Sequence, residues 1–202
     1  DDAILAEESG YSNSSSARRW IIDPIDGTTN FARGLPGWTI SIAVEDDQGL
    51  LASVVADPTT GEVYTAHRGK GAFLNGVRLS PKTNTDTIDG KFDGIVYAGH
   101  YAYNYDREDN GRKSRLYDTI RYGHRSFGSA AISLAYTAAG KVDATYFEVP
   151  IFDWDVAAGI LLCREAGLEA NLYDPAGTGE HKRLIAGPKN LSDEILRLSD
   201  SV

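Results

Sequence analysis

Short apolar runs with the alternation typical of strands fill the first half of the chain. Runs rich in β-branched and aromatic side chains, with turn-forming residues between them, occupy residues 20–22, 38–44, 50–55 and 62–66. The polar residues 45–49 join two of these runs and predict a hairpin, and residues 69–76 are typical of a turn and a short strand. A further short run at residues 3–6 precedes a polar loop expected at residues 10–19. We therefore expect a largely antiparallel sheet in this half.

The pattern changes in the second half, where strands and helices alternate. Helical spacing of apolar positions predicts helices over residues 126–139, 155–166 and 192–198. Short apolar runs predict strands at residues 94–98, 142–147 and 184–187. Residues 104–112 are polar enough for an exposed loop. Strands followed by alternating strands and helices indicate a layered α+β fold, divided into residues 1–92 and an α/β half with the smaller sheet, residues 93–202.

The composition is that of an ordinary soluble globular protein, with 42% hydrophobic and 24% charged residues among 202. Apolar runs such as residues 160–163 are far shorter than the roughly 20 residues that a membrane span needs. We recognise no signal peptide. The single cysteine, Cys163, excludes an intramolecular disulfide, so we expect a cytoplasmic protein in which this residue belongs to the core.

Charge narrows the classes of partner. A net charge of −9 argues against a nucleic-acid-binding protein, which usually carries a basic surface. An acidic protein that acts on an anionic substrate can invert its local potential with bound divalent cations. The chain also lacks methionine and opens in an apolar run, so we expect further residues before Asp1.

The segment from Asp23 to Phe31 carries the most informative chemistry. Asp23 and Asp26 follow directly on an apolar strand, with a proline in the turn between them. Hard cations such as Mg²⁺ prefer oxygen ligands of this kind, and the carbonyl of Ile25 can join them. The amides of Gly27 and Thr28 can donate to phosphate oxygens, since glycine allows the backbone to approach a ligand. The alternative is that Asp26 simply caps a helix that follows it.

Two more acidic groups are candidates, although each has an ordinary explanation in isolation. Glu7 and Glu8 follow the first apolar run, and such pairs are typical of a solvated surface. Asp155 precedes an apolar helical segment and is the expected N-cap of that helix. The four histidines show no spacing typical of metal ligands.

These segments resemble the signatures of the inositol monophosphatase family, a magnesium-dependent and lithium-sensitive superfamily of phosphatases, in the same order along the chain. The matching segments are Ala6–Ser9, Trp20–Phe31 and Trp154–Gly159, with further similarity at Gly69–Gly76 and Arg125–Ala131. The chain departs from the family where Ala6 replaces a glycine, and it lacks the N-terminal helical pair of the family.

The resemblance implies a fold, an activity and an assembly. The fold would be a layered α-β-α-β-α sandwich, like that of sugar phosphatases, with residues 1–92 supplying the metal-binding sheet. The activity would be hydrolysis of a small phosphate monoester, with inositol monophosphate as the leading candidate, by water activated with two or three Mg²⁺ ions. Family members are commonly homodimers, and no nucleic-acid or membrane partner is implied.

The resemblance also implies a set of metal ligands. One ion would be held by Glu7, Asp23 and the carbonyl of Ile25, and a second by Asp23, Asp26 and Asp155. A third, weaker ion would depend on Glu7. Adjacent residues of a strand point to opposite faces, so we expect only one of Glu7 and Glu8 to face the ions, and the match to the family selects Glu7.

Catalytic and substrate contacts follow from the same matches. Glu7 and Thr28 would orient the attacking water, with Asp26 as a further catalytic residue. The substrate-binding set would be Asp26, Gly27, Thr28, Ala130, Glu148 and Asp155. In this set Glu148 and Ala130 would contact the hydroxyl groups of the alcohol. The stretch that carries Glu148, residues 142–148, is one residue longer than is usual in the family.

Other readings of the same residues remain open. Thr29–Phe31 speaks against relatives that act on 3′-phosphoadenosine 5′-phosphate, but fructose-1,6-bisphosphatase and histidinol-phosphatase activities remain alternatives. A non-catalytic binding protein on the same fold is a third, because fold alone does not establish function. The presence of all four carboxylates of the metal site favours an enzyme.

Overall fold

The structure is a computed structural model that describes residues 2–12, 14–98, 123–149, 151–174 and 182–200. The loop predicted at residues 104–112 lies outside the described residues.

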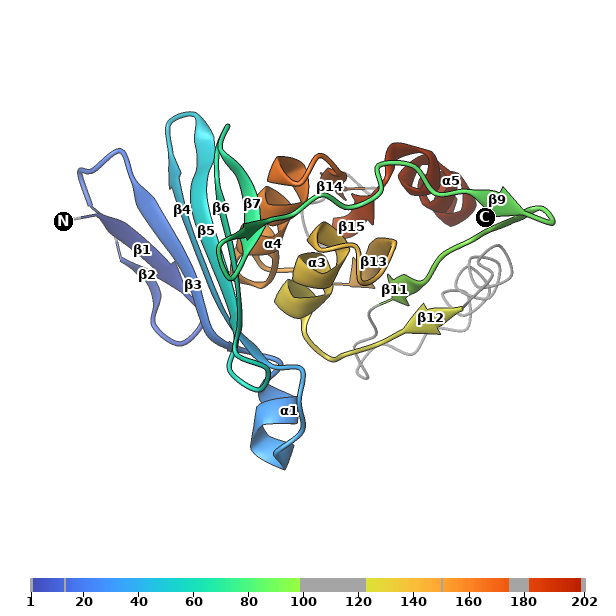
Figure 1. Ribbon diagram of the computed structural model, residues 1–202. Helices are drawn as coiled ribbons and strands as arrows, with labels where there is room; N and C mark the ends of the chain where they lie inside the picture. Colours follow the sequence, from blue (N-terminus) through green and yellow to red (C-terminus); the bar gives the residue numbers. More distant parts are fainter. Residues whose placement is uncertain (1, 13, 99–122, 150, 175–181, 201–202) are drawn as a thin grey trace.

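The first half of the chain forms one large sheet of eight strands (Figure 1). In spatial order, the strands are β2 (Gly10–Ser12), β1 (Ala3–Ala6), β3 (Arg19–Asp26), β4 (Thr39–Asp46), β5 (Gly49–Asp57), β6 (Glu62–His67), β7 (Gly71–Leu74) and β8 (Val77–Arg78). Only β1 and β3 run parallel, so the expected antiparallel sheet is confirmed. The expected loop at residues 10–19 is partly wrong, because β2 pairs with β1 although its three side chains are exposed.

Two helices cover the inner face of this sheet (Figure 1). They are α3 (Ala130–Ala138) and α4 (Asp153–Glu165). Val55 and Tyr64 from the sheet are fully buried against this helix pair, together with Leu134 and Leu162 of the helices themselves. The two helices touch closely at Gly159, where a Cβ atom would lie 2.4 Å from the Cβ of Leu134.

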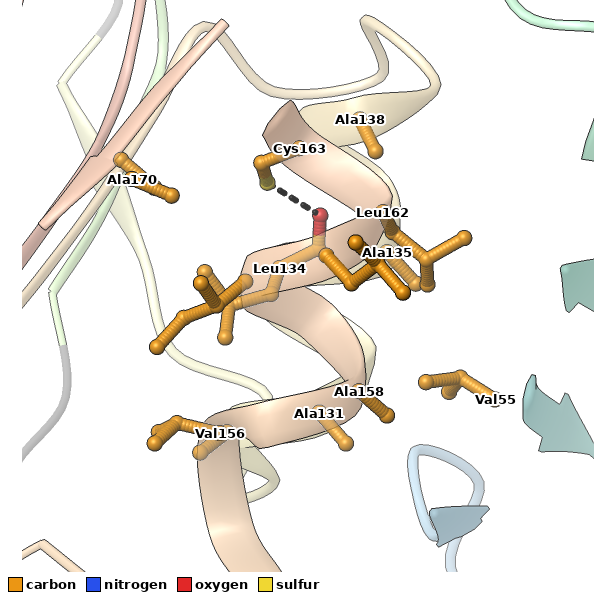
Figure 2. Packing of buried hydrophobic residues seen from close by; sticks show 14 of the residues in the cluster. Val55, Ala131, Leu134, Ala135, Ala138, Val156, Ala158, Leu162, Cys163 and Ala170 are labelled. Atoms are coloured by element: carbon orange, nitrogen blue, oxygen red, sulfur yellow. Dashed lines mark hydrogen bonds between the residues drawn. The ribbon is translucent and has the colours of Figure 1, made fainter. Parts of the chain in front are cut away.

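Figure 2 shows this core from close by. Cys163 lies fully buried in it, and its Sγ donates a hydrogen bond of 3.3 Å to the carbonyl of Leu134. Burial raises the pKa of the Cys163 thiol to about 12. The thiol is therefore neutral and enclosed, in agreement with its interpretation as a core residue.

A second sheet lies on the other side of the helix pair. Its strands, in spatial order, are β12 (His124–Arg125), β11 (Val96–Ala98), β13 (Ala144–Val149), β15 (Lys182–Gly187) and β14 (Glu169–Tyr173). Helix α5 (Lys189–Asp200) covers the far face, where Leu191 and Ile195 pack against Tyr146 and Ile185. A small hairpin of β9 (Thr87–Ile88) and β10 (Lys91–Phe92) lies on the connection between the two sheets.

The order of layers is thus large sheet, helix pair, small sheet and helix. This order confirms the α+β sandwich, and in the described residues it corresponds to the last four layers of the implied fold. Sequence periodicity misplaced some boundaries. Helix α3 begins at Ala130 rather than at residue 126, because Ser129 is extended and its side chain accepts a hydrogen bond from the backbone of Ile132.

Candidate metal centre

Three aspartates from distant parts of the chain meet where β3 ends and α4 begins. One carboxylate oxygen from each of Asp23, Asp26 and Asp155 lies within 4.8 Å of the others, and all three residues are buried. In a regular strand, residues three apart face opposite sides of the sheet. The pairing of β3 with β4 shifts register between Asp23 and Asp26, and such an irregularity allows both side chains to reach the same side.

Helix α4 brings Asp155 to the cluster from its first turn. The helix begins at Asp153 with Phe152 as N-cap, so the expectation that Asp155 is itself the N-cap is wrong. Instead, Oδ2 of Asp155 accepts a hydrogen bond of 2.9 Å from the backbone N–H of Phe152. This is the reaching-back interaction of a capping box, which fixes the orientation of the carboxylate.

Asp26 is held by the other helix of the pair. Its Oδ2 accepts hydrogen bonds from Ser129 Oγ at 2.5 Å and from the backbone N–H of Ala131 at 2.7 Å. Asp26 does not cap the helix that follows it, since α1 (Thr28–Arg33) begins after Gly27 without a side-chain cap. The alternative explanation of Asp26 as a local cap is therefore wrong. The helix predicted over residues 126–139 included Ser129, so its role as N-cap was not expected from the sequence, although serine is a typical N-cap residue.

Burial and like charge make this cluster unfavourable without a counter-ion. Burial, then the charge of Asp26, raises the pKa of Asp23 to about 8. Burial raises the pKa of Asp155 to about 7, and that of Asp26 to about 6 against the hydrogen bond from Ser129. Among the described residues, no lysine or arginine forms an ion pair with any of the three. A divalent cation that prefers oxygen ligands fits this donor set.

Glu7 lies beside the cluster but outside the group of three. It is an exposed residue in the turn after β1, and its backbone N–H donates to the carbonyl of Ile22 at 3.2 Å. Its charge contributes to the raised pKa of all three aspartates, so its carboxylate is close enough to act on them. The argument that Glu7 and Glu8 alternate along a strand is wrong, because β1 ends at Ala6.

The turn between β3 and α1 is held by its own polar atoms. Asp23 Oδ1 accepts from the backbone N–H of Ile25 at 2.9 Å, and Thr28 Oγ1 donates to the carbonyl of Ile25 at 3.2 Å. Both Ile25 and Thr28 are thus close to the carboxylates in the chain and in space. Their roles as metal ligand and water-orienting group stay predictions.

Gly27 is needed for close packing as well as for its backbone conformation. Its φ is +90°, and a Cβ atom there would lie 2.9 Å from the carbonyl oxygen of Gly37 and 3.2 Å from the Cβ of Ser129. Gly34, at the other end of α1, has φ +66° but no described atom within 4 Å of such a Cβ. A substitution at Gly34 would therefore introduce backbone strain alone, whereas one at Gly27 would introduce both backbone strain and steric overlap.

We expect Gly27→Ala to destabilise the protein more than Gly34→Ala. Both substitutions place an L-residue in a left-handed conformation, which costs about 1–2 kcal/mol. Gly27→Ala adds overpacking against Gly37 and Ser129, typically about 1–3 kcal/mol more. Thermal unfolding measures the difference, since 1 kcal/mol shifts Tm by about 2–4 °C at this size. Equal Tm values for the two variants would contradict the close approach at Gly27.

The two remaining candidate substrate contacts, Ala130 and Glu148, lie in α3 and β13. Ala130 is the buried first residue of α3, next to the Ser129–Asp26 hydrogen bond. Glu148 lies in β13 opposite Arg183 of β15 in the strand register, and its side chain is outside the described part of the structure. The substrate contacts of both residues stay predictions.

Two further side chains, which were not expected to have a role, fix helices α1 and α4. Asn30 donates through Nδ2 to the carbonyls of Gly37, at 2.9 Å, and Phe127, at 2.6 Å, and so ties α1 to the loop before α3. At the far end of α4, both carboxylate oxygens of Glu165 accept from backbone amides of the Gly69–Gly76 motif at 2.8 Å. In this chain, that motif anchors the end of α4 to the turn between β6 and β7.

Comparison with known proteins places this arrangement in context. The model of the inositol monophosphatase family matches residues 1–202. The chain is 40% identical over 170 residues to a protein named Nus factor SuhB of Pasteurella multocida, which covers 83% of this chain and 61% of the relative. It is 41% identical over 160 residues to the inositol-1-monophosphatase of Rhizobium meliloti, covering 75% of this chain and 55% of that protein.

Solved structures agree with the sequence comparison. The extragenic suppressor protein suhB of Bartonella henselae superimposes with a TM-score of 0.87 at 32% identity, over 100% of this chain and 77% of that one. The inositol monophosphatase of Anabaena gives a TM-score of 0.83 at 31% identity, over 100% and 79% of the two chains.

The chain spans only about 55–61% of the length of these two curated relatives. In the part of the chain that the structure describes, no helix has the length and apolar character needed to cross a membrane. The match of the family model over all 202 residues nevertheless shows that this chain belongs to the inositol monophosphatase family.

Proposed function

We propose that this chain carries the catalytic core of a Mg²⁺-dependent phosphatase that hydrolyses a small phosphate monoester, inositol monophosphate foremost, to the alcohol and inorganic phosphate. The convergence of Asp23, Asp26 and Asp155 supports the proposal most strongly. Three buried carboxylates with no cationic partner among the described residues support the binding of divalent cations, and membership of the family supports phosphate ester hydrolysis.

Different residues of the chain would bind the cations and the phosphate group. When bound, divalent cations supply an activated water and neutralise charge on the leaving oxygen. Asp23, Asp26 and Asp155 would hold two or three such ions together with Glu7 and the carbonyl of Ile25. The amides of Gly27 and Thr28 would bind the phosphate group as its negative charge increases.

Thr28 and Glu7 would orient the attacking water. The Thr28 hydroxyl gives its proton to the carbonyl of Ile25, so its lone pairs are directed away from that bond and can accept from water. Glu7 is exposed to solvent, unlike the three buried aspartates. Ala130 and Glu148 would contact the alcohol, and hydrogen bonds to its hydroxyl groups would discriminate against analogues that lack them.

A panel of phosphate monoesters tests the proposal. We expect Mg²⁺-dependent release of phosphate, fastest from inositol 1-phosphate and slower from fructose 1,6-bisphosphate and histidinol phosphate. A different order within the panel would reassign the substrate but keep the reaction. No turnover of any monoester over a full Mg²⁺ titration would overturn the proposed function.

Among acidic and hydroxyl residues near the metal ligands, we expect an order of effects on turnover. Glu7→Gln should be at least as damaging as Thr28→Ala, and Glu8→Gln should be mildest. Orienting a water is typically worth about 10²–10⁴ in rate, and Glu7 adds metal affinity to this effect. Glu8 is a matched control, since it is the adjacent exposed glutamate. If Glu8→Gln were as damaging as Glu7→Gln at saturating Mg²⁺, the assignment of Glu7 would be wrong.

The names of several relatives raise a second candidate function. The chain is 40% identical, over 83% of its length, to a protein named Nus factor SuhB. A role as a Nus factor, separate from catalysis, is therefore the second candidate function. Asp155→Asn distinguishes the two roles, because it removes a metal ligand from the buried site and leaves the surface unchanged. A variant without phosphatase activity that still replaced a relative's Nus factor in cells would establish the second role.

A further inference from the structure

The hydroxyl group of Ser129 makes two short hydrogen bonds. It accepts a hydrogen bond of 3.1 Å from the backbone N–H of Ile132, as the N-cap of α3. It also lies 2.5 Å from Oδ2 of Asp26. Because a hydroxyl carries one proton, and its acceptor side faces Ile132, the Ser129 proton points to Asp26.

These contacts fix the orientation of the Asp26 carboxylate. Oδ2 receives two donors, the Ser129 hydroxyl and the backbone N–H of Ala131, both on the first turn of α3. Both Ser129 and Asp26 are buried, at 2% and 6% exposure, so water does not compete freely for these bonds. Oδ1 is then the oxygen of Asp26 that is available to a ligand in the cluster.

We propose that Ser129 is a positioning residue, whose hydroxyl turns Asp26 so that the carboxylate presents one oxygen to a divalent cation shared with Asp23 and Asp155. The proposal rests on cation binding at the proposed active site, but it does not require that phosphate esters are the substrate. It assigns Ser129 a role that acts through Asp26 and not through direct contact with substrate.

Helix capping alone does not explain why residue 129 is a serine, because its hydroxyl makes a second hydrogen bond, to Asp26. An N-cap needs only an acceptor, and Asp, Asn and Ser serve about equally well in that role. An aspartate at position 129 would cap α3 but would have no proton for Asp26 and would add a further negative charge to the cluster. Only a hydroxyl both accepts from Ile132 and donates to Asp26 through the same atom.

A neighbouring hydroxyl belongs to the same polar pocket. Thr39 lies opposite Asp26 in the register of β4, is fully buried, and has its Oγ1 3.4 Å from Ser129 Oγ. This contact is longer than the one between Ser129 and Asp26. We therefore place the orienting role on Ser129, with Thr39 as its neighbour in the large sheet.

Three substitutions of Ser129 separate positioning from capping. Ser129→Ala removes both interactions. Ser129→Gly removes the donor, yet glycine caps a helix nearly as well as serine. Ser129→Thr keeps both. For each variant we would measure Mn²⁺ binding to the metal-free protein by electron paramagnetic resonance, and folding by circular dichroism and Tm.

We expect the Mn²⁺ affinity of Ser129→Ala and Ser129→Gly to be about tenfold weaker or more, the usual effect of removing a group that orients a metal ligand. Ser129→Thr should bind Mn²⁺ nearly as tightly as the unsubstituted protein. If Ser129→Ala does not fold, Ser129→Gly decides the question. A folded Ser129→Gly protein with unchanged Mn²⁺ affinity would overturn the proposal.

Thr137→Val is the matched control on the same helix. Thr137 is a buried residue whose hydroxyl bonds to the carbonyl of Ser133 and to Thr145 Oγ1, far from the carboxylates along α3. We expect this variant to have a lower Tm with unchanged Mn²⁺ affinity. An equal loss of Mn²⁺ affinity in Thr137→Val would show a general effect of α3 packing, and the positioning role would fail.

Activity assays keep this inference distinct from the proposed function. Weaker Mn²⁺ binding in Ser129→Gly, in a protein that hydrolyses no monoester, supports positioning and overturns the phosphatase. Normal Mn²⁺ binding in the same variant of an active phosphatase overturns positioning and leaves the phosphatase standing. In an active enzyme, added Mg²⁺ should restore much of kcat to Ser129→Gly, since the substitution weakens cation binding and leaves the carboxylates present.

Discussion

Asp155→Asn is expected to lower phosphomonoester turnover by roughly 10²-fold or more while the protein remains folded. Removal of a group that only orients a metal ligand costs roughly 10–100-fold, and removal of a ligand charge should exceed this. The fold should persist because an asparagine at this position can still accept the hydrogen bond from the backbone N–H of Phe152. The substitution also relieves repulsion among the three carboxylates.

Asp153→Asn provides the matched control. Asp153 lies in the same first turn of α4, two residues from Asp155, but its carboxylate faces Arg19 at 3.7 Å. We expect this control to keep its turnover and its Mg²⁺ requirement. Steady-state kinetics over a Mg²⁺ titration would compare the two variants. A crystal soaked in Mn²⁺ without density near Asp23, Asp26 and Asp155, or equal damage by both substitutions, would contradict the site.

Metal-free protein is expected to lose stability as the pH rises from about 5.5 to 9. The folded-state pKa values of Asp26, Asp155 and Asp23 are raised to about 6, 7 and 8 from 3.8. Between 3.8 and these values, the folded state binds more protons than the unfolded state. Stability therefore falls as pH rises through this window, until all three groups are ionised.

Thermal unfolding with and without Mg²⁺ measures this effect. We expect Tm in a chelator to be at least about 5 °C lower at pH 9 than at pH 5.5, since several kcal/mol correspond to such a shift in a protein of this size. Saturating Mg²⁺ should remove most of the decline, because it binds the folded state and neutralises the cluster. Asp23→Asn in chelator should flatten the decline, because one of the three charges is gone.

The effect of Mg²⁺ on Tm is the decisive part of this measurement, because Asp143, outside the cluster, also contributes to the decline of stability with pH. Burial also raises the pKa of Asp143, which accepts a hydrogen bond of 2.7 Å from the backbone N–H of Ile95 outside the cluster. Its contribution to the decline should not respond to Mg²⁺. If Mg²⁺ left the Tm at pH 9 unchanged, the three aspartates would not form a site for that ion.

Much of this architecture follows from local sequence pattern. Alternating apolar runs located the central strands of the large sheet, and helical spacing located α3, α4 and α5 to within a few residues. The short strands β2 and β14 were missed, because three exposed residues or a mixed run such as Glu169–Tyr173 carry little periodic signal. These strands depend on hydrogen bonding to a neighbour, which local pattern does not reveal.

In the candidate site, too, the sequence identified the residues but not the long-range contacts that bring them together. Residue types and signatures identified the three aspartates, but strand alternation alone would place Asp23 and Asp26 on opposite faces. The register shift in the pairing of β3 with β4 allows both side chains to reach the same side. The hydrogen bond between Ser129 and Asp26 joins residues 103 positions apart, and Ser129 lay inside the helix predicted from sequence rather than at its N-cap.

The late position of the helix pair in the chain has a consequence for synthesis on the ribosome. Strands β1–β8 are complete at Arg78, whereas the helix that covers them and carries Asp155 ends at Glu165. At about 5–20 residues per second, roughly 4–17 s pass between these two points. Until that point, Val55 and Tyr64, which end up fully buried, lack α4, one of the two described helices that cover them. Asp155, the third carboxylate of the cluster, is made only with α4. A divalent cation bound by all three aspartates would therefore stabilise the completed domain but not the sheet before α4 is made.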